Sequence, residues 1–558
     1  MNSFLLQEYL KVPAPFGMSD WLTFWLMAVI AVLNGIVMLF VGYKFLQILQ
    51  LSGYKLKGYC EWFRATKAKY LGRLVILSFL STAALLVTNV LLEQFFIYKI
   101  LTYLGLVFYF LFCLIFIFNM YNAPQKVPLK YTKRMNRLCV VLFLVVAAVT
   151  FIVMTSSERY IPYLRYGSLG LTPIFLPLLV MIAFWITYPL EVVISKYYVI
   201  KAKKKLKNEF PNIITIGITG SYGKTTVKNI LTTILSQKYR VCATPFSYNT
   251  PLGLSKTILD KLKPNTEILV AEMGAKYVGD IKYLTEMIEP NIGVITGIGN
   301  QHLATFGSQE NLVATKAELF AHMKKGAKAY VNTDVKLSKD LYDNINCEKY
   351  STSINSKEGK FFVENVSVSG SGSKFDLIVD GQKIECETIL LGEHNISNIL
   401  LAVAVAYDLG VGLEDIKRAI SKLTPPAHRL AIVPSSNSLT IIDDAYNASV
   451  EGVRAALDVI SKFEGQKIII TPGLIELGQE EYKANFEFGK QMAEVADYVI
   501  IDGVINFEPI SKGLESGGFD MKNLLRAGSL SQAVEVLNTF TKPGDVVLFE
   551  NDLPDNYL

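Results

Sequence analysis

The sequence predicts an α/β enzyme preceded by an all-α transmembrane region, and three observations lead to this fold class. Of the 558 residues 51% are hydrophobic, and the excess lies almost entirely before residue 196. Near residue 220 a buried strand runs into a glycine-rich loop and then into a helix. From there to the C-terminus strands and helices alternate, a pattern typical of parallel sheets covered by helices. A chain of this length is expected to form roughly three or four domains.

Residues 1–195 are expected to form about five transmembrane helices. Most of the apolar stretches are roughly 20 residues long, enough to cross about 30 Å of hydrocarbon as helices. They are expected at residues 22–41, 74–92, 100–118, 138–154 and 169–190. As an alternative, one stretch, chiefly the fourth, forms a buried or re-entrant helix. The first stretch lacks a basic leader and is too long for a signal peptide, so a cleaved signal is disfavoured.

The distribution of lysine and arginine predicts the orientation. These residues are concentrated between the first and second stretches, between the third and fourth, and after the fifth. The positive-inside rule therefore places the N-terminus outside the cell membrane and everything after Lys196 in the cytoplasm. Residues 196–208 are expected to be a basic cytoplasmic linker, which either contacts anionic headgroups or is simply solvated. Because these loops account for the net charge of +6, no nucleic-acid partner is expected.

A phosphate-binding loop is predicted after the linker. Residues 213–217 form a short apolar strand that continues into Ile218-Thr-Gly-Ser-Tyr-Gly-Lys-Thr-Thr226 and an amphipathic helix. In this context backbone N–H groups converge on phosphate oxygens at a helix N-terminus. Lys224 would reach the β- and γ-phosphates, and the Thr225 hydroxyl would bind magnesium. The strict motif requires glycine at position 218, where Ile218 stands, so the loop is a shorter variant.

Two further side chains are expected at the same edge of the sheet. Glu272 ends the apolar strand 268–271, so its carboxylate should emerge beside the phosphate loop as a hard oxygen ligand for magnesium. The alternative is an ordinary carboxylate at a strand end. His302 follows a second strand at residues 292–295. From its chemistry alone, a metal ligand and a hydrogen-bonding group are equally favoured.

The variant loop resembles that of the Mur ligases, the ATP-dependent amide-forming enzymes of peptidoglycan synthesis. The resemblance extends from about residue 210 to the C-terminus and is closest to the branch that adds D-alanyl-D-alanine. Six further segments match in the family's order, at residues 270–281, 299–308, 314–319, 391–398, 428–430 and 442–448. Each match alone is weak, but their order over more than half of the chain is specific.

The resemblance implies ATP and Mg²⁺ as cofactors and assigns the site residues. The implied catalytic residues are Lys224, Lys316 and His302. The implied metal ligands are Thr225, Glu272, His302 and Lys316, the last as a carbamate, a modification that sequence cannot show. The implied ATP contacts are Gly220, Ser221, Tyr222, Gly223, Lys224, Thr225, Thr226, His394, Asn395, Asn398, Arg429 and Asp444.

Structural alternatives remain for several of these residues. Without the resemblance, Lys316 and Glu318 would be interpreted as ordinary solvated residues of an amphipathic helix. Asn395 at a helix start is otherwise an N-cap. Asp444 is otherwise a carboxylate at the end of a strand.

The strand and helix pattern divides the cytoplasmic part into two domains. A central ATP-binding ligase domain is expected at residues 209–424, with an antiparallel addition near 349–390. A Rossmann-like C-terminal ligase domain is expected at 425–558, after a hinge at residues 424–426. Its strands are predicted at residues 439–443, 467–471, 498–501 and 546–549.

The resemblance also implies the reaction, in which ATP converts a carboxylate to an acyl phosphate and an amine then forms the amide. The transmembrane region replaces the family's UDP-sugar-binding domain, so a lipid-linked or membrane-proximal acceptor is expected. The resemblance implies an amino acid or dipeptide as the amine donor. Which one it is stays open, because residues 548–555 lack the Lys-Gly-Ser segment of that branch. Tyr222 and Ser449-Val450 also depart from the family pattern.

Two alternative functions remain. One is a membrane synthase of poly-γ-glutamate or a similar polymer. The other is a nucleotide-switched transporter or scaffold, disfavoured because few charges interrupt the apolar stretches.

Overall fold

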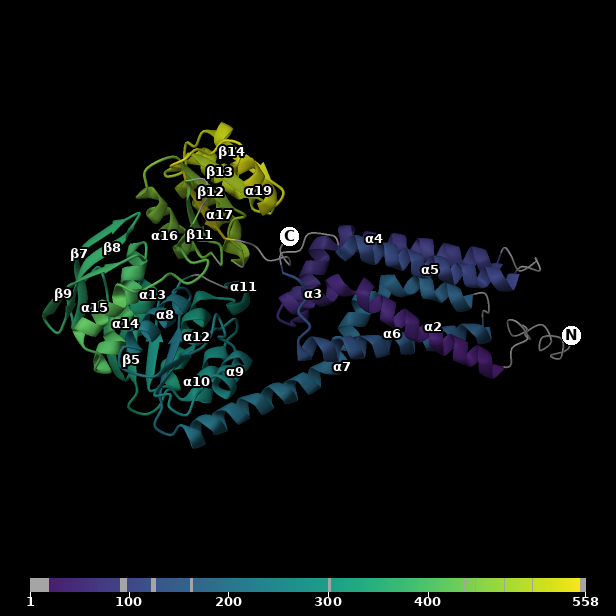
Figure 1. Cartoon of the computed structure of the whole chain (residues 1–558), viewed down its shortest axis with the longest axis horizontal. Helices are drawn as coiled ribbons and strands as arrows, with labels where there is room; N and C mark the ends of the chain where they lie inside the picture. The colour runs from purple at the N-terminus through teal and green to yellow at the C-terminus, as the bar shows by residue number, and fades with distance from the viewer. Residues whose placement is uncertain are drawn as a thin grey trace. The chain divides into compact units, whose positions relative to one another are not determined.

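The computed structural model describes residues 20–90, 98–121, 127–160, 164–299, 303–434, 438–446, 448–475, 477–503 and 505–551. His302 lies outside these residues. The chain forms two compact units, which meet in sequence between Ile194 and Ser195. We refer to them as the helical unit and the ligase unit and describe each by itself (Figure 1).

The helical unit consists of long apolar helices. They are α2 (Asp20–Val41), α3 (Tyr43–Leu51), α4 (Leu56–Val90), α5 (Tyr98–Tyr121), α6 (Lys133–Tyr160) and α7 (Leu164–Glu209). Stretches within α2, α5, α6 and α7 are long and apolar enough to cross a membrane, and α4 contains a shorter apolar stretch, Tyr70–Leu86. The described residues of all five predicted apolar stretches are therefore helical, and α3 is an addition that we did not predict. Large apolar side chains such as Phe79 and Trp185 remain exposed, as expected for a lipid-facing surface.

A buried polar cluster links four helices of this unit. The Asn34 side-chain amide on α2 donates hydrogen bonds to Thr150 on α6, at 2.9 Å, and to Thr172 on α7, at 3.4 Å. The Tyr109 hydroxyl on α5 donates to the side-chain amide oxygen (Oδ1) of Asn34 at 2.5 Å. Because each polar group has a partner, the cluster fixes the packing of these helices without unsatisfied groups in an apolar interior.

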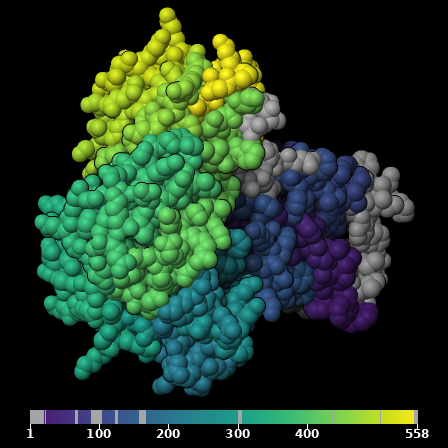
Figure 2. Space-filling model, turned by 60° about the vertical axis from the view of Figure 1, so that its left-hand side comes forward, coloured from purple at the N-terminus to yellow at the C-terminus, as the bar shows by residue number. Residues whose placement is uncertain are grey.

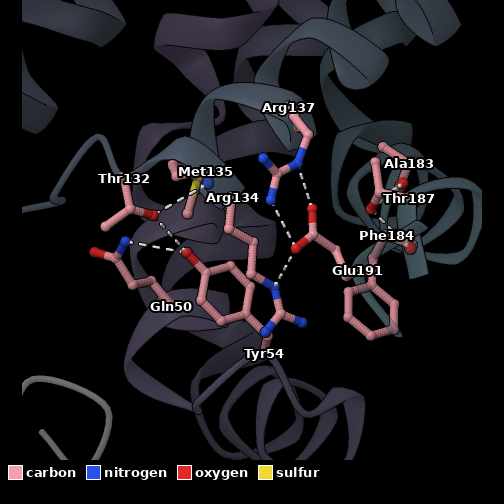
Figure 3. Close-up of polar contacts among 10 residues, drawn as sticks. All are labelled: Gln50, Tyr54, Thr132, Arg134, Met135, Arg137, Ala183, Phe184, Thr187 and Glu191. Carbon is pink, nitrogen blue, oxygen red and sulfur yellow. Dashed lines mark hydrogen bonds and ion pairs between the residues drawn. The ribbon is translucent and has the colours of Figure 1, made fainter. Parts of the chain in front are cut away.

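A second polar cluster joins the start of α6 and the residues before it to α3, to Tyr54 and to α7 (Figure 3). Arg137 donates two hydrogen bonds to the Glu191 carboxylate, at 2.6 and 2.9 Å. The guanidinium of Arg134 lies 3.9 Å from the centre of the Tyr54 ring, and Gln50 bonds the Lys130 backbone. Some of the basic residues between the third and fourth apolar stretches, from which we predicted the membrane orientation, therefore contact neighbouring helices.

The predicted linker at 196–208 differs from the structure, because α7 continues as a helix to Glu209. Val199, Ala202 and Leu206 are buried with residues of α9 and α10 in the ligase unit. The Lys203 ammonium donates to the Glu286 carbonyl at 2.7 Å, and Lys205 donates to the Leu259 carbonyl at 3.0 Å. The apolar residues recur at helical spacing on one face, and the lysines occupy the other positions. The basic segment therefore belongs to the packed ligase unit.

The centre of the ligase unit is a six-stranded parallel sheet of order β2-β3-β1-β4-β5-β6. Its strands are β1 (Ile214–Thr219), β2 (Val241–Ala243), β3 (Ile268–Glu272), β4 (Ile292–Ile295), β5 (Lys328–Asn332) and β6 (Glu348–Thr352). Its helices are α8 (Lys224–Leu235), α9 (Pro251–Asp260), α10 (Asp280–Ile288), α11 (Leu303–Phe306), α12 (Gln309–Ala321), α13 (Lys336–Asp343), α14 (Glu393–Asp408) and α15 (Leu413–Ile420).

Helices cover both faces of this sheet, as predicted. Along β3, Ile268 and Val270 pack with α8 and α14, whereas Leu269 and Ala271 pack with α9 and α10. This alternation is the one that a strand buried on both faces requires. In the space-filling view the teal and green residues of this part of the chain form one continuous surface (Figure 2).

The predicted antiparallel addition is confirmed as a three-stranded sheet of β7 (Phe361–Ser369), β8 (Gly372–Val379) and β9 (Gln382–Thr388). The C-terminal part contains a second six-stranded sheet of order β10-β11-β15-β12-β13-β14. Its strands are β10 (Ala431–Val433), β11 (Thr440–Asp444), β12 (Lys467–Thr471), β13 (Tyr498–Asp502), β14 (Leu524–Ala527) and β15 (Val546–Glu550). Its helices are α16 (Val450–Ser461), η2 (Gly478–Glu480), α17 (Glu481–Ala493), α18 (Phe507–Ser516), η3 (Met521–Asn523) and α19 (Leu530–Leu537). The four predicted strands are present, and β10 and β14 are additional.

Candidate active site

The phosphate loop connects β1 to α8 and lies tightly against the end of β4. Gly220 has φ +154°, and a Cβ atom there would lie 2.1 Å from the Thr296 hydroxyl, so only glycine fits. The Ser221 N–H donates to the Gly297 carbonyl at 2.7 Å. Gly223, at φ +74°, turns the chain into α8, whose first residue is Lys224. The predicted strand, loop and helix are confirmed, and the loop ends at the positive end of a helix dipole.

Lys224 is half-buried and lies within the loop. Its ammonium donates to the carbonyls of Gly220, at 2.8 Å, and Ser221, at 2.7 Å. Desolvation lowers the pKa of Lys224 to about 8, Glu272 opposes this shift, and the positive charge of Arg429 adds to it. Two cations therefore act on each other here, an arrangement that an anionic phosphate would stabilise.

Glu272 ends β3 beside the phosphate loop, as predicted, and is 1% exposed. One carboxylate oxygen accepts from the Thr225 hydroxyl at 3.0 Å and from the Lys228 ammonium at 3.1 Å. The other accepts from the Asn249 amide at 3.1 Å. Lys228 and Asn249 were not predicted. Lys228 lies one helical turn after Lys224 and so faces the same side of α8, whereas Asn249 has no sequence signal.

The residues beside the loop suit magnesium. Thr225 and Glu272 present hard oxygen atoms in contact, and Mg²⁺ typically takes one or two carboxylates together with substrate phosphates and water. Within the described residues no group of three or more His, Cys, Asp and Glu side chains converges on a metal position. A Thr–Glu pair next to a phosphate loop therefore fits magnesium shared with a nucleotide better than a metal bound by protein ligands alone.

Lys316 on α12 is 3% exposed, so the alternative of a solvated helical lysine is wrong. Burial, together with the charge of Lys224, lowers the pKa of Lys316 to about 7. A lysine with this pKa is partly neutral at physiological pH, and only the neutral amine reacts with carbon dioxide. Glu318, which we paired with Lys316 in that alternative, instead accepts hydrogen bonds from the backbone of Gly279 and Lys282 at the start of α10.

The start of α14 lies against the phosphate loop. Gly392 is the N-cap residue of this helix, so the alternative of an Asn395 N-cap is wrong. Asn395 instead donates to the Leu391 carbonyl at 2.7 Å and lies 3.4 Å from the Asn398 amide. The Asn398 oxygen is so close to Gly223 that a Cβ there would lie 2.8 Å from it. Burial lowers the pKa of His394 to about 4, which keeps this imidazole neutral.

The C-terminal sheet contributes the remaining predicted residues. Asp444, at the end of β11, accepts a hydrogen bond from the Leu430 N–H at 3.1 Å. Burial raises the pKa of Asp444 to about 6, and Arg429 opposes that shift. The Arg429 guanidinium lies 4.4 Å from the centre of the Tyr446 ring, whose hydroxyl bonds Ser247 of the central part at 2.7 Å. Arg429 thus acts electrostatically on both Lys224 and Asp444.

Tyr222, which departs from the family pattern, fills the space between the loop and β4. A Cβ at Gly297 would lie 2.6 Å from its ring, so the two positions fit each other. Burial raises the pKa of Tyr222, and the nearby Glu451 carboxylate on α16 raises it further. Glu451 was not predicted, and it lies close enough to Gly299 to exclude a side chain there.

Comparison with known proteins gives two family matches. The Mur ligase middle domain matches residues 218–406, and the Mur ligase, glutamate ligase domain matches residues 428–550. Among curated proteins, the Bacillus subtilis UDP-N-acetylmuramoyl-tripeptide–D-alanyl-D-alanine ligase is 30% identical over 60% of this chain and 72% of its own length. The Buchnera aphidicola protein of the same name is 33% identical over 48% of this chain and 58% of its own length.

Solved structures agree with this relationship. The MurF ligase from Thermotoga maritima in complex with ADP has a TM-score of 0.58 and 26% identity, covering 64% of this chain and 80% of that one. A MurF structure from Acinetobacter baumannii, with a TM-score of 0.59 and 24% identity, supports the fold over 65% of this chain and 78% of its own. The order of the motifs, the geometry of the phosphate loop and these matches lead to one conclusion: the chain belongs to the Mur ligase family of ATP-dependent, amide-forming enzymes.

Proposed function

We propose that this Mur ligase is anchored in the cell membrane and forms an amide through an acyl phosphate, in the synthesis of cell-wall peptide or a related envelope polymer. The observation that carries the proposal is the arrangement of Lys224, Thr225 and Glu272 at the carboxyl edge of the central sheet. As a member of its family the enzyme uses ATP and Mg²⁺.

The roles of the loop residues follow from their positions. The N–H groups of Gly220–Thr226 and the start of α8 would bind the ATP phosphates. Lys224 and Arg429 would stabilise the negative charge that develops as the γ-phosphoryl group is transferred to the acceptor carboxylate. Thr225 and Glu272 would hold magnesium, which neutralises phosphate charge when bound. Closure of the C-terminal part through Arg429 and Asp444 would exclude water until the amine attacks.

The remaining site assignments rest on the family resemblance and on where these side chains lie relative to the phosphate loop. Asn398 lies against the phosphate loop, which supports a contact with the nucleotide, and His394 and Asn395 open the same helix. The buried, partly neutral Lys316 supports carbamylation. His302 would complete the metal ligands.

The substrates are proposed from the helical unit and from the names of the relatives. The curated relatives are named as ligases of a UDP-N-acetylmuramoyl-tripeptide and D-alanyl-D-alanine. In this chain the residues before the matched region form long apolar helices instead. We therefore propose a carboxylate acceptor at or in the membrane, such as one within a lipid-linked precursor, and an amino acid or dipeptide as amine donor. The ligase unit would lie in the cytoplasm and the N-terminus outside.

The test is ADP release by the purified full-length protein. A ligase is expected to release ADP only when a carboxylate acceptor, supplied as membrane extract, and an amine are both present, with an amide product in mass spectra. Lys224→Met should abolish turnover, whereas the exposed control Lys261→Met should not change it. ADP release without either substrate would support the nucleotide-switch alternative, and a ladder of products would support a polymer synthase.

A further inference from the structure

Phe246, in the loop after β2, is a large apolar side chain that the fold holds in solvent beside the active site. It is 82% exposed, and its backbone has φ +47°, a conformation that is rare and strained for a bulky residue. The Phe246 carbonyl accepts a hydrogen bond from the buried Lys228 ammonium, and the Tyr446 hydroxyl donates to the next residue, Ser247, at 2.7 Å. Contacts of the active site therefore fix the backbone that presents this exposed ring.

The side chains next to Phe246 are aromatic, aliphatic and basic. The centre of its ring lies 6.4 Å from that of Tyr248, and the Lys256 ammonium lies 5.7 Å from the Tyr248 ring. Leu252 and Lys256 are both exposed and are four residues apart on α9, so they share one face of that helix. The exposed ring of Phe246 thus continues onto the start of α9.

The loop after β3 extends this surface. It touches the first loop where the Gly274 N–H donates to the Asn249 carbonyl at 2.9 Å. Its acid, Asp280, accepts hydrogen bonds from the backbone N–H groups of Lys276 and Tyr277, both at 2.9 Å, so this charge is used within the loop. We call the exposed side chains of the two loops and of α9 the rim patch, which consists of Phe246, Leu252, Lys256, Lys276, Tyr277 and Val278. Aromatic and aliphatic side chains combined with lysines are typical of surfaces in the interface of a bilayer.

The chain keeps the rim patch within reach of a membrane. The helices that follow the two loops, α9 and α10, pack against Val199, Ala202 and Leu206 of α7. The part of α7 before these residues contains the apolar stretch that is long enough to cross a membrane. Leu190, the last residue of the fifth predicted stretch, precedes Val199 by nine residues, so the two lie at most about 32 Å apart in any arrangement. An apolar patch that close to a bilayer is stabilised when it leaves water.

We propose that the rim patch lies in the cytoplasmic interface of the lipid bilayer and holds the active site against the membrane. Phe246, Leu252 and Val278 would enter between the headgroups, and Lys256 and Lys276 would lie beside lipid phosphates. The carboxyl edge of the central sheet would then face the bilayer, so a membrane-bound carboxylate could reach ATP without leaving the membrane. This inference rests on the proposed function and adds how the enzyme reaches its acceptor.

Photo-crosslinking of the full-length protein tests the contact itself. p-Benzoylphenylalanine replaces Phe246, and the protein is reconstituted into vesicles of phosphatidylcholine and phosphatidylglycerol. After irradiation and proteolysis, the peptide that contains position 246 should carry the mass of one lipid. The same amino acid at Ile389, an apolar residue after β9 that is 55% exposed, should give no lipid adduct. A crosslink from position 246 to the helical unit, or equal lipid adducts at both positions, would overturn the inference.

A substitution tests what the contact does. Phe246→Asn removes the ring but keeps a residue type that tolerates positive φ. In vesicles supplied with Mg–ATP, amine and membrane extract, it should raise the KM for the extract about tenfold, equal to about 1.4 kcal/mol, and leave kcat and the KM for ATP unchanged. Phe246→Trp should keep the wild-type KM, because tryptophan suits the membrane interface.

Ile389→Asn is the matched control and should change no constant, and thermal melting of each variant checks folding. A missing lipid adduct at position 246, or an unchanged KM in Phe246→Asn, would overturn the inference and leave the ligase function standing. If the wild-type protein releases no ADP and forms no amide, the proposed function fails. The crosslink needs no turnover, so it would still decide whether the rim patch lies in the bilayer.

Discussion

Lys228 shows how a single residue can complete a site that its motif only outlines. Its side chain is 2% exposed, and its ammonium lies 3.1 Å from the Glu272 carboxylate. It also donates to the Phe246 carbonyl, so it connects α8 to β3 and to the segment before Asn249. A buried ion pair of this kind orients the carboxylate more than it adds net stability. We therefore regard Lys228 as a positioning residue for Glu272.

We expect Lys228→Met to lower the free energy of unfolding by about 3 kcal/mol, because it leaves the buried Glu272 without its cation. The KM for magnesium should rise, since the Glu272 carboxylate loses its fixed orientation. Chemical denaturation measures the first effect and a magnesium titration of ADP release measures the second.

Lys282→Met is the control for this experiment. Lys282 is half-exposed and lies 3.9 Å from an equally exposed Glu286, so its removal should change stability by less than about 0.5 kcal/mol. If Lys228→Met weakens magnesium binding no more than Lys282→Met does, Lys228 has only a structural role. Lys228→Arg should restore part of the magnesium affinity, because it keeps the positive charge.

At the scale of elements, the end of α7 is the clearest difference between expectation and structure. A run of lysines suggested a solvated linker, yet residues 195–209 form a helix that packs on the ligase unit. Ala202 is fully buried there among apolar side chains of α9 and α10. The helical spacing of Val199, Ala202 and Leu206 is present in the sequence, but frequent lysines obscure it.

This packing predicts different effects for two substitutions in the same segment. Ala202→Asp should lower the free energy of unfolding of the ligase unit by about 3 kcal/mol or more, because it buries an unpaired charge, and the melting temperature should fall with it. Lys204→Asp, at an exposed position two residues away, should change this free energy of unfolding by less than about 0.5 kcal/mol. Differential scanning fluorimetry with ATP present would measure both. Equal effects would mean that the segment is a linker after all.

At the scale of the whole molecule, the proposal combines an enzyme with a membrane anchor. Apolar helices of sufficient length and exposed large side chains support the anchor. The distribution of basic loops supports an external N-terminus. Both statements concern the helical unit alone and can be tested without knowing the substrates.

Reporter fusions would test this topology. Alkaline phosphatase fused after residue 96, beyond the second apolar stretch, should be active because it lies outside the cell. The same reporter fused after residue 128 should be inactive because that loop is cytoplasmic. A green fluorescent protein at the C-terminus of the full chain should fluoresce and should remain in the membrane fraction after an alkaline carbonate wash. The reverse phosphatase pattern would contradict the orientation, and release by the wash would contradict the anchor.

Sequence alone determined those features that depend on local pattern. The apolar stretches, the strand, loop and helix around Gly220, some strands of both sheets and the position of Glu272 at a strand end all follow from periodicity and from residues close in the chain. The order of the motifs likewise identified the family.

The tertiary structure decided which distant residues meet and which charges are buried. Lys228 and Asn249 converge on Glu272, Arg429 acts on Lys224, and Glu550 is enclosed beside Asp444. These relations join residues from 23 to about two hundred positions apart, and the burial that shifts their pKa values exists only once sheets and helices are packed. A local pattern contains neither the partner nor the dielectric environment of a side chain, and the chemistry of this site depends on both.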